Sequence, residues 1–254
     1  MAFYGVLGDI HGNLEALEAV LAALDARGVD RIACVGDIVG YNADPDACVK
    51  ALRERQAIAI AGNHDLIGTG RLGFERCSNK AMHSLKRTRR AIAPHTGEYL
   101  SSLPAHHVLD ERTLLIHGGV RDVQQYMTQP KHVVENVRYL REDFPGIRLC
   151  FFGHTHEQRV FEIVGEEVRA VPPSFVDLSP HREYFVNPGS VDASRKRSAK
   201  FAEYLVFDSE GLTLDFARVP YDDGRTEMRA EAGGYRISRW RERLYDVQRR
   251  LIRA

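Results

Sequence analysis

Short runs of large apolar residues recur along the chain, and each ends at a glycine or a polar residue. The runs are "AFYGVL" at 2–7, "RIACV" at 31–35, "AIAIA" at 57–61, "TLLI" at 113–116 and "RLCFF" at 148–152. Runs of this length bounded by turn residues are typical of buried strands, whose carboxyl ends deliver polar side chains to one edge of a sheet. The pattern therefore predicts five buried β-strands.

Segments with helical periodicity lie between the first three of these predicted strands. A stripe of leucines follows Asn13 and stops before Gly28, which places Asn13 as the N-cap and Gly28 just past the helix end. A second helix is expected to start at Asp44 and Pro45, because aspartate can cap and proline suits the first helical position. Alternation of strand and helix predicts parallel βαβ units.

The pattern changes after residue 157. Apolar runs now face each other across single glycines: "RVFEIV" and "EVRAV" across Gly165, and "AEYLVFD" and "LTLDFARV" across Gly211. Such pairs predict antiparallel hairpins. We expect these hairpins to form a second sheet that packs on the first.

The chain is predicted to be one domain at 1–220 with a helical, cap-like insertion at about 66–105, followed by a C-terminal basic amphipathic helix extension at 221–254. Between Arg71 and Arg90 there are seven basic residues and one acidic residue. Two interpretations stay open for this stretch, a solvated helical face or a surface that attracts anionic substrate.

The C-terminal extension carries one narrow apolar stripe at helical spacing, formed by Ile237, Trp240, Leu244, Val247 and Leu251. Docking of this stripe on the main domain is the first interpretation, and a homodimer through the C-terminal helix is the second. Seven arginines between Arg236 and Arg253 are equally typical of a solvated face, so they argue only weakly for nucleic acid.

Composition and charge narrow the class of protein. The 254 residues are 44% hydrophobic and 28% charged, which is typical of a soluble globular protein. The 35 basic and 35 acidic residues cancel, so the net charge argues neither for nucleic acid nor for an acidic surface as the partner. The four cysteines are scattered, as expected of free thiols in a reducing compartment. No basic leader and no apolar run near about 18 residues is present, so we expect a cytoplasmic protein that does not bind membranes.

Polar residues with metal-binding side chains follow each of the five predicted strands. In chain order they are Asp9, His11, Asp37, Asn63, His64, His117, His154 and His156. Oxygen and imidazole donors without a thiolate suit manganese, iron, zinc or nickel. Two ions about 3.5 to 4 Å apart need a shared ligand, and a carboxylate bridges best, which makes Asp37 the candidate.

The ordered motifs D-x-H, G-D, G-N-H-D, H-G and G-H-x-H resemble those of the calcineurin-like metallophosphoesterase superfamily. "NPGSV" at 187–191 extends the resemblance, which is greatest to the small bacterial phosphoesterases of the YfcE-like and diadenosine-tetraphosphatase-like kind. The resemblance implies an α/β fold, a four-layer α/β/β/α sandwich of two mixed β-sheets flanked by helices. It does not extend to the region after about residue 220.

The resemblance also implies roles for individual residues. Two divalent metal ions are expected, with manganese favoured for activity and a metal-bridging hydroxide as the attacking group. The first ion would be held by Asp9, His11 and His156, the second by Asn63, His117 and His154, and both by Asp37. The sequence departs from protein Ser/Thr phosphatases at 39–41, where an aspartate and an arginine of their motif are missing.

Catalytic and substrate-binding residues are predicted from their places beside the ligands. His64 is similar to the catalytic histidine of the family, and Asp65 would hold its imidazole or simply cap a turn. Asn13 is expected to cap its helix and to direct the helix amino terminus at the substrate phosphate. Arg121 and Tyr126 are candidate substrate contacts or ordinary loop residues, and 195–197 form a basic rim or a charged turn.

The function predicted from these residues is hydrolysis of phosphate mono- or diesters in a small nucleotide-like or other phosphorylated compound. The alternative substrate is a dinucleoside polyphosphate such as diadenosine tetraphosphate. A nuclease and a non-catalytic scaffold of the same fold are the weaker alternatives. A scaffold should lack some ligands, whereas all seven ligand positions and His64 carry the expected residue types.

Overall fold

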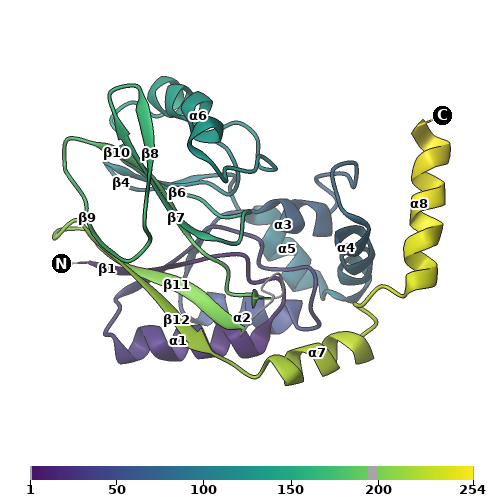
Figure 1. Cartoon of the computed structure of the whole chain (residues 1–254). Helices are drawn as coiled ribbons and strands as arrows, with labels where there is room; N and C mark the ends of the chain where they lie inside the picture. The colour runs from purple at the N-terminus through teal and green to yellow at the C-terminus, as the bar shows by residue number, and fades with distance from the viewer. Residues whose placement is uncertain (1, 194–199, 254) are drawn as a thin grey trace.

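Two six-stranded β-sheets lie face to face in the computed structural model, which describes residues 2–193 and 200–253, with side chains in the last helix described up to Asp246 (Figure 1). The first sheet has the order β3-β2-β1-β11-β12-β9 and the second β4-β5-β6-β10-β7-β8. The first comprises β1 (Phe3–Leu7), β2 (Arg31–Cys34), β3 (Ile58–Ala59), β9 (Phe175–Asp177), β11 (Phe201–Asp208) and β12 (Thr213–Pro220). The second comprises β4 (His107–Asp110), β5 (Thr113–Leu115), β6 (Leu149–Phe151), β7 (Gln158–Val164), β8 (Glu167–Val171) and β10 (Glu183–Pro188).

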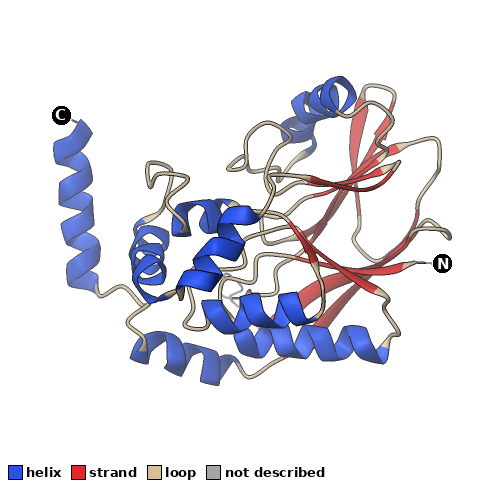
Figure 2. Cartoon of the chain, turned by 180° about the vertical axis from the view of Figure 1, so that it is seen from behind, coloured by secondary structure: helices blue, strands red, loops and turns tan. Residues whose placement is uncertain are grey.

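Helices cover the outer face of each sheet, as both views of the ribbon show (Figures 1 and 2). Helices α1 (Leu14–Ala26) and α2 (Pro45–Glu54) pack on the first sheet, and α6 (Pro130–Asp143) packs on the second. Helices α3 (Asn63–Gly68), α4 (Asn79–Ala91) and α5 (Pro94–Ser102) follow β3, and α7 (Asp223–Ala232) and α8 (Arg239–Arg253) end the chain. The predicted four-layer α/β/β/α sandwich is confirmed.

All five predicted buried strands are present, but the sheets divide them differently from the prediction. Strands β1, β2 and β3 are parallel neighbours in the first sheet, whereas β5 and β6 are parallel neighbours in the second. The hairpin β11–β12 pairs antiparallel with β1 rather than joining the hairpin β7–β8. The expectation of a separate antiparallel sheet was wrong, because an apolar run shows that a strand is buried without showing which strand it pairs with.

The core between the sheets is built from aromatic and branched side chains of both. Phe151 on β6 and Phe207 on β11 meet edge to face, with ring centroids 5.4 Å apart, and both are buried. On the outer face, α1 lies close to β1 because Gly5 has no side chain; a Cβ there would come within 2.6 Å of Leu24 Cδ2. The sandwich is thus packed tightly on both faces of the first sheet.

The predicted ends of α1 are confirmed, and the predicted cap of α2 is not. Asn13 Oδ1 accepts a hydrogen bond from Ala16 N at 3.1 Å, and Gly28 has a φ of +64° just past the helix. Pro45 occupies the first turn of α2, but the Asp44 side chain does not cap it. Asp44 instead forms an ion pair with Arg229 of α7.

The C-terminal extension packs on the domain through α7 and projects from it through α8 (Figure 1). Thr226 and Ala230 of α7 are buried, whereas Trp240 and Leu244 of α8 are 70% and 41% exposed. Helix α8 touches α4 through Asp246, which accepts a hydrogen bond from Asn79 Nδ2 at 2.7 Å. Docking of the apolar stripe was therefore wrong for these two residues. The side chains of residues 247 and 251 lie outside the description, and the homodimer stays a prediction.

Among the described helices, none has the length and apolar character needed to cross a membrane.

Replacing Phe207 by alanine should weaken the contact between the two sheets. We expect Phe207→Ala to lower the free energy of unfolding by about 3 to 5 kcal/mol in urea denaturation, because the cavity cannot refill. The control is Phe175→Ala on β9 of the same sheet, where the ring is 61% exposed and the loss should stay below about 1 kcal/mol. Equal losses in both variants would show that the inter-sheet core does not depend on this ring.

Candidate metal centre

The loops that follow the parallel strands are joined to one another by backbone hydrogen bonds. Asp9 N donates to Gly36 O at 3.0 Å, and Gly153 N donates to His117 O at 2.8 Å. Gly36 has a φ of +91°, and a Cβ there would come within 2.5 Å of Gly62 N. Glycine is therefore required at this position, and it brings the loop of Asp37 against the loop of Asn63.

Five of the predicted ligands have a left-handed backbone. The φ angles are +50° for Asp9, +53° for His11, +55° for Asp37, +67° for His154 and +60° for His156. Three other non-glycine residues among those described have such a φ, and one of these, Tyr41, lies beside the same site. Backbone strain of this kind costs about 1 to 3 kcal/mol per residue and clusters at functional sites. The strain thus marks the ends of these strands, which come from both sheets, as a functional site.

One group of side chains is formed by Asp9, His11 and His156. The Nε2 atoms of His11 and His156 are 3.0 Å apart, and His156 Nε2 is 3.3 Å from Asp9 Oδ1. His11 Nε2 is 3.8 Å from the same Asp9 oxygen. All three residues are buried, and their ligand atoms lie within 4.8 Å of one another, close enough to share one ion.

A second group is formed by Asp37, His117 and His154, with Asn63 beside it. His117 Nε2 lies 3.3 Å from Asp37 Oδ2 and 3.1 Å from Asn63 Oδ1. The rings of His117 and His154 have centroids 5.3 Å apart. This division, with His156 in the first group and His154 in the second, is the one that the sequence motifs predict; ion binding itself stays a prediction.

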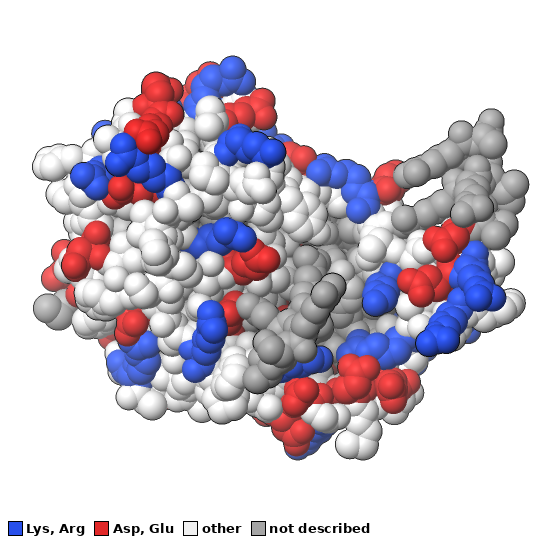
Figure 3. Space-filling view, in the orientation of Figure 1, with Lys and Arg blue, Asp and Glu red and all other residues white. Residues whose placement is uncertain are grey.

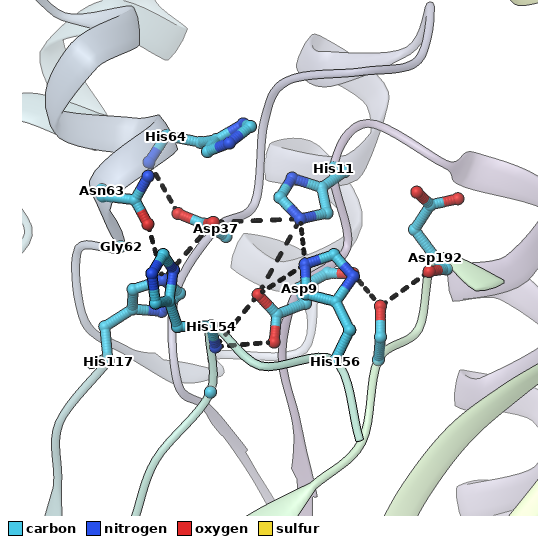
Figure 4. Close-up of polar contacts among 12 residues, drawn as sticks. Asp9, His11, Asp37, Gly62, Asn63, His64, His117, His154, His156 and Asp192 are labelled. Carbon is cyan, nitrogen blue, oxygen red and sulfur yellow. Dashed lines mark hydrogen bonds and ion pairs between the residues drawn. The ribbon is translucent and has the colours of Figure 1, made fainter. Parts of the chain in front are cut away.

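Asp37 lies between the two groups (Figure 4). Its Oδ2 is 3.3 Å from His117 Nε2 and 3.8 Å from His11 Nε2, so one carboxylate faces both. Its Oδ1 accepts a hydrogen bond from His64 N at 2.7 Å. The buried set of carboxylate, amide and imidazole donors fits two divalent ions that share Asp37.

The orientation of His117 is set by its other ring nitrogen. His117 Nδ1 lies 2.7 Å from the carbonyl oxygen of Val35, which can only accept, so Nδ1 carries a proton in this contact. Its Nε2 is then the nitrogen that faces Asp37 and Asn63, and it is the one that a metal ion would bind in place of a proton. A backbone carbonyl that fixes the tautomer of a histidine in this way is typical of metal sites.

The charges of the site shift the pKa values of its members. Burial alone raises the pKa of Asp37, but the nearby imidazoles of His117, His64 and His11 outweigh burial and hold it well below its usual range. Burial lowers the pKa of His117, and the Asp37 carboxylate more than reverses this and raises it to about 9. Asp37 is thus held as an anion, as a metal ligand must be.

Asp65 joins two site loops rather than holding an imidazole. Its Oδ1 accepts from the N–H groups of Ile38 and Val39, at 2.9 and 3.1 Å, and its Oδ2 accepts from Gly62 N at 2.9 Å. Burial and the Asp37 charge raise the pKa of Asp65 to about 7. The expectation that Asp65 orients His64 by a side-chain bond is corrected in favour of turn capping.

Asn13 and Arg121, two predicted substrate contacts, bind other residues of the fold. Asn13 is completely buried; its Nδ2 donates to Asp192 Oδ1 at 2.9 Å, and its Oδ1 accepts from Thr226 Oγ1 at 3.0 Å as well as capping α1. Arg121 pairs with Glu142 and Asp143 at the end of α6. Both residues are structural, because neither side chain faces the cavity described next.

A cavity of about 990 Å³ opens beside the site. Its lining includes Asn63, His64 and His154 of the site, and the other lining residues are Tyr41, Arg76, Cys77, Ser78, Lys80, Ala81, Gln124, Tyr126, Lys200, Glu227, Tyr235, Arg236 and Ile237. Tyr126 is 48% exposed and packs on His154 with ring centroids 4.0 Å apart; its contact with substrate stays a prediction. Residues 195–197, the predicted basic rim, lie outside the described residues.

Sequence reasoning missed residues that support the site from a distance. Asn187 Nδ2 donates to Gly153 O at 2.8 Å, and Ser190 Oγ donates to Asp9 O at 2.9 Å, so "NPGS" holds two ligand turns together. The motif itself was the signal for this role. Lys80 belongs to the basic stretch at 71–90, but nothing in the sequence places Lys200 and Arg236 beside it in the cavity wall, because the three residues are far apart along the chain.

Comparison with known proteins agrees with the fold. The family model of the calcineurin-like phosphoesterase superfamily domain matches residues 3–211. The chain belongs to this superfamily, and it is a metal-dependent hydrolase of phosphate esters.

The relatives include uncharacterized and structurally solved proteins. A protein of Methanocaldococcus jannaschii is 30% identical over 222 residues, covering 85% of this chain and 87% of the relative. A metallophosphoesterase from Sphaerobacter thermophilus has a TM-score of 0.75 at 28% identity, covering 95% of this chain and 96% of its own. A hypothetical protein of Pyrococcus horikoshii OT3 has a TM-score of 0.71 at 18% identity, covering 93% and 95%. Coverage this high includes part of the C-terminal extension, which the sequence motifs had left outside the resemblance.

Replacing the shared carboxylate should disturb both groups of ligands. We expect Asp37→Asn to bind fewer metal ions per chain than the wild type and to lose at least about 100-fold in phosphoesterase activity, because one residue serves two ions. The measurements are elemental analysis after dialysis and initial rates. Asp192→Asn is the control, since that buried carboxylate bonds Asn13 instead of facing the ligands. Full metal content and activity in Asp37→Asn would contradict the shared role.

Proposed function

We propose that the protein is a dinuclear metal-dependent phosphoesterase acting on a small, nucleotide-like phosphate ester. In this proposal one ion is held by Asp9, His11 and His156, the other by Asn63, His117 and His154, and both by Asp37. The observation that carries it is the position of Asp37, whose Oδ2 lies within 3.8 Å of an imidazole nitrogen from each group. The two ions would supply activation of a water molecule for in-line attack and neutralisation of phosphate charge. Manganese suits the oxygen and nitrogen donors.

His64 is proposed as the group that hydrogen-bonds the phosphate or protonates the leaving oxygen. Its ring lies 4.6 Å from the ring of His11 and lines the cavity. Gly40 leaves room for it, because a Cβ at Gly40 would come within 2.3 Å of His64 Nδ1. An imidazole is suited to this role because its ordinary pKa is near neutrality.

The cavity wall supports an anionic substrate with a planar group. Tyr41 and Tyr126 offer ring surface, and Arg76, Lys80, Lys200 and Arg236 bring four cationic side chains against one carboxylate, Glu227. Arg76 is neutralised by Asp122 and Arg236 by Glu227. Within the described residues, no ion pair is formed by Lys80 or Lys200. These two lysines are therefore the groups that favour a phosphorylated leaving group.

A dinucleoside polyphosphate remains the alternative substrate, supported by the size of the cavity, which reaches the upper range of small-molecule sites, about 300 to 1,000 Å³. A nuclease has less support. Acidic and basic side chains are intermixed on the face shown in Figure 3, whereas a nucleic-acid track requires a region of positive charge.

Hydrolysis of a substrate panel tests the proposal. Nucleoside monophosphates, cyclic nucleotides, nitrophenyl mono- and diesters, dinucleoside polyphosphates and single-stranded DNA are assayed with manganese, iron, zinc or nickel. We expect hydrolysis of small nucleotide-like esters with manganese and none after chelation. Hydrolysis of DNA alone, or no dependence on metal, would reject the proposed function.

Removal of the proposed proton donor should separate catalysis from metal binding. We expect His64→Ala to lower kcat by about 100-fold or more, the range typical of general acid–base catalysis, with metal content unchanged. Elemental analysis and steady-state kinetics on the same preparation measure both quantities. Unchanged kcat rejects the role, and loss of metal would instead identify His64 as a ligand, which its place in a group with His11 and Asp37 allows.

Removal of Lys80, which forms no ion pair within the described part of the chain, should affect charged leaving groups selectively. We expect Lys80→Gln to raise KM for nucleoside polyphosphates by about 3- to 5-fold, the effect of one partly exposed charge. KM for nitrophenyl phosphate should stay unchanged. Lys86→Gln is the matched control on the same helix, because the Lys86 ammonium lies over the ring of Tyr245, outside the cavity. Equal effects of the two variants, or of the two substrates, would contradict the assignment.

A further inference from the structure

The C-terminal extension returns to the active site between α7 and α8. Tyr235, Arg236 and Ile237 line the same cavity as His64, although they lie beyond residue 211, where the match to the superfamily model ends. Tyr235 is buried against the domain. This segment is therefore part of the wall of the proposed active site.

Arg236 makes the most specific contacts of the segment. Its Nη1 donates to the carbonyl oxygen of Tyr41 at 2.8 Å, and its Nη2 donates to Asn42 Oδ1 at 3.0 Å. Its Nε donates to Glu227 Oε1 at 2.7 Å, so α7 holds the guanidinium from the other side. A planar fork that bonds three partners in fixed directions cannot be reproduced by lysine.

The loop that Arg236 holds touches two site histidines. Tyr41 has a φ of +35°, which is unfavourable for a residue with a side chain, and its ring lies 4.8 Å from the rings of both His11 and His64. Asn42 donates to His11 O from its backbone N at 3.0 Å and from its Nδ2 at 3.2 Å. Movement of this loop would change what packs against His64.

Helix α7, which precedes Arg236 in the chain, packs beside α1 (Figure 1). Thr226 Oγ1 donates to the cap residue Asn13, and Arg229 pairs with Asp44. Arg229 is 39% exposed and Arg236 is 32% exposed at the side chain, and both pair with a carboxylate. Arg229 is thus a natural control, an ion pair of the same segment that does not touch Tyr41.

We propose that Arg236 is a positioning residue, which holds the strained loop at Tyr41 so that the tyrosine ring packs against His64. The C-terminal extension thereby completes the catalytic site that the ends of the β-strands begin. Without the fork, the loop at Tyr41 relaxes toward an unstrained φ, and the imidazole of His64 loses one wall. The proposal rests on the catalytic role of His64 given above, and it adds a determinant outside the superfamily domain.

Kinetics of three variants test the proposal. We expect Arg236→Gln to lower kcat by about 10-fold or more with KM changed less than about 3-fold, since misplacement of a catalytic group costs turnover. Arg229→Gln should lower the melting temperature and keep kcat within about 2-fold of the wild type. The reason is that the partly exposed ion pair of Arg229 with Asp44 does not contact the loop at Tyr41. Arg236→Lys should stay impaired. Full recovery with lysine would show that positive charge, not the fork, is needed, and would overturn the proposal.

A double variant identifies the residue through which Arg236 acts. If Arg236 works through Tyr41, the loss in Tyr41→Ala/Arg236→Gln should be close to the loss in Tyr41→Ala alone. Independent effects would multiply instead. A multiplied loss would therefore overturn the proposed path from Arg236 to His64.

A readout without turnover separates this inference from the proposed function. In protein with ¹⁵N-labelled histidine, the ring resonances of His64 should shift in Arg236→Gln and not in Arg229→Gln, with assignment by His64→Ala. If the wild type hydrolyses nothing in the panel, the proposed function fails while this shift still tests the contact. Unchanged His64 resonances in Arg236→Gln would reject the positioning role.

Discussion

A buried carboxylate shared by two groups of imidazoles is the constraint on which the rest of the site depends. Asp37 is almost fully buried, and an isolated carboxylate in that position would be strongly unfavourable. The imidazoles around it hold its pKa low, with His117 the nearest contributor. Two residues fix the loop of Asp37. Gly36 lets the backbone approach Gly62, and the Asp65 carboxylate accepts hydrogen bonds from the N–H groups of Ile38 and Gly62. The buried charge of Asp37 therefore depends on the imidazoles around it and on the residues that fix its loop.

This site also concentrates backbone strain, and the fold around it explains how that strain persists. The five predicted ligands with a left-handed φ would relax if their loops were free. Each loop instead begins at the end of a strand within a sheet, and the two sheets are joined by aromatic packing such as that of Phe151 and Phe207. The apolar sandwich offsets the strain, and the strained turns direct side chains from separate strands to one point.

The strands and the meeting of polar side chains at their ends could be predicted from the sequence because both signals are local. A buried apolar run followed by Asp-x-His can be recognised within ten residues. Polar residues that follow parallel strands are expected to meet at the carboxyl ends of those strands. Pairing partners are not local: nothing near β11 indicates that it joins β1. The partners of Asn13 and Arg121 are not local either. Asn13 bonds Asp192, and Arg121 pairs with Glu142 and Asp143, so both side chains are already engaged within the fold. Arg236 lies nearly two hundred positions from Tyr41, so only the structure joins them.

The extension after β12 contacts the loops of the site at two places, although it lies at the end of the chain. On one side Arg236 holds the loop that follows Asp37. On the other, Thr226 bonds Asn13, which bonds Asp192, whose N–H donates to the carbonyl of Asp9. The strand ends carry the predicted metal ligands, whereas the extension contributes Tyr235, Arg236 and Ile237 to the wall of the cavity. Because function resides in sites carried by a fold, substitutions in such a segment can change the accepted leaving group while every ligand stays in place.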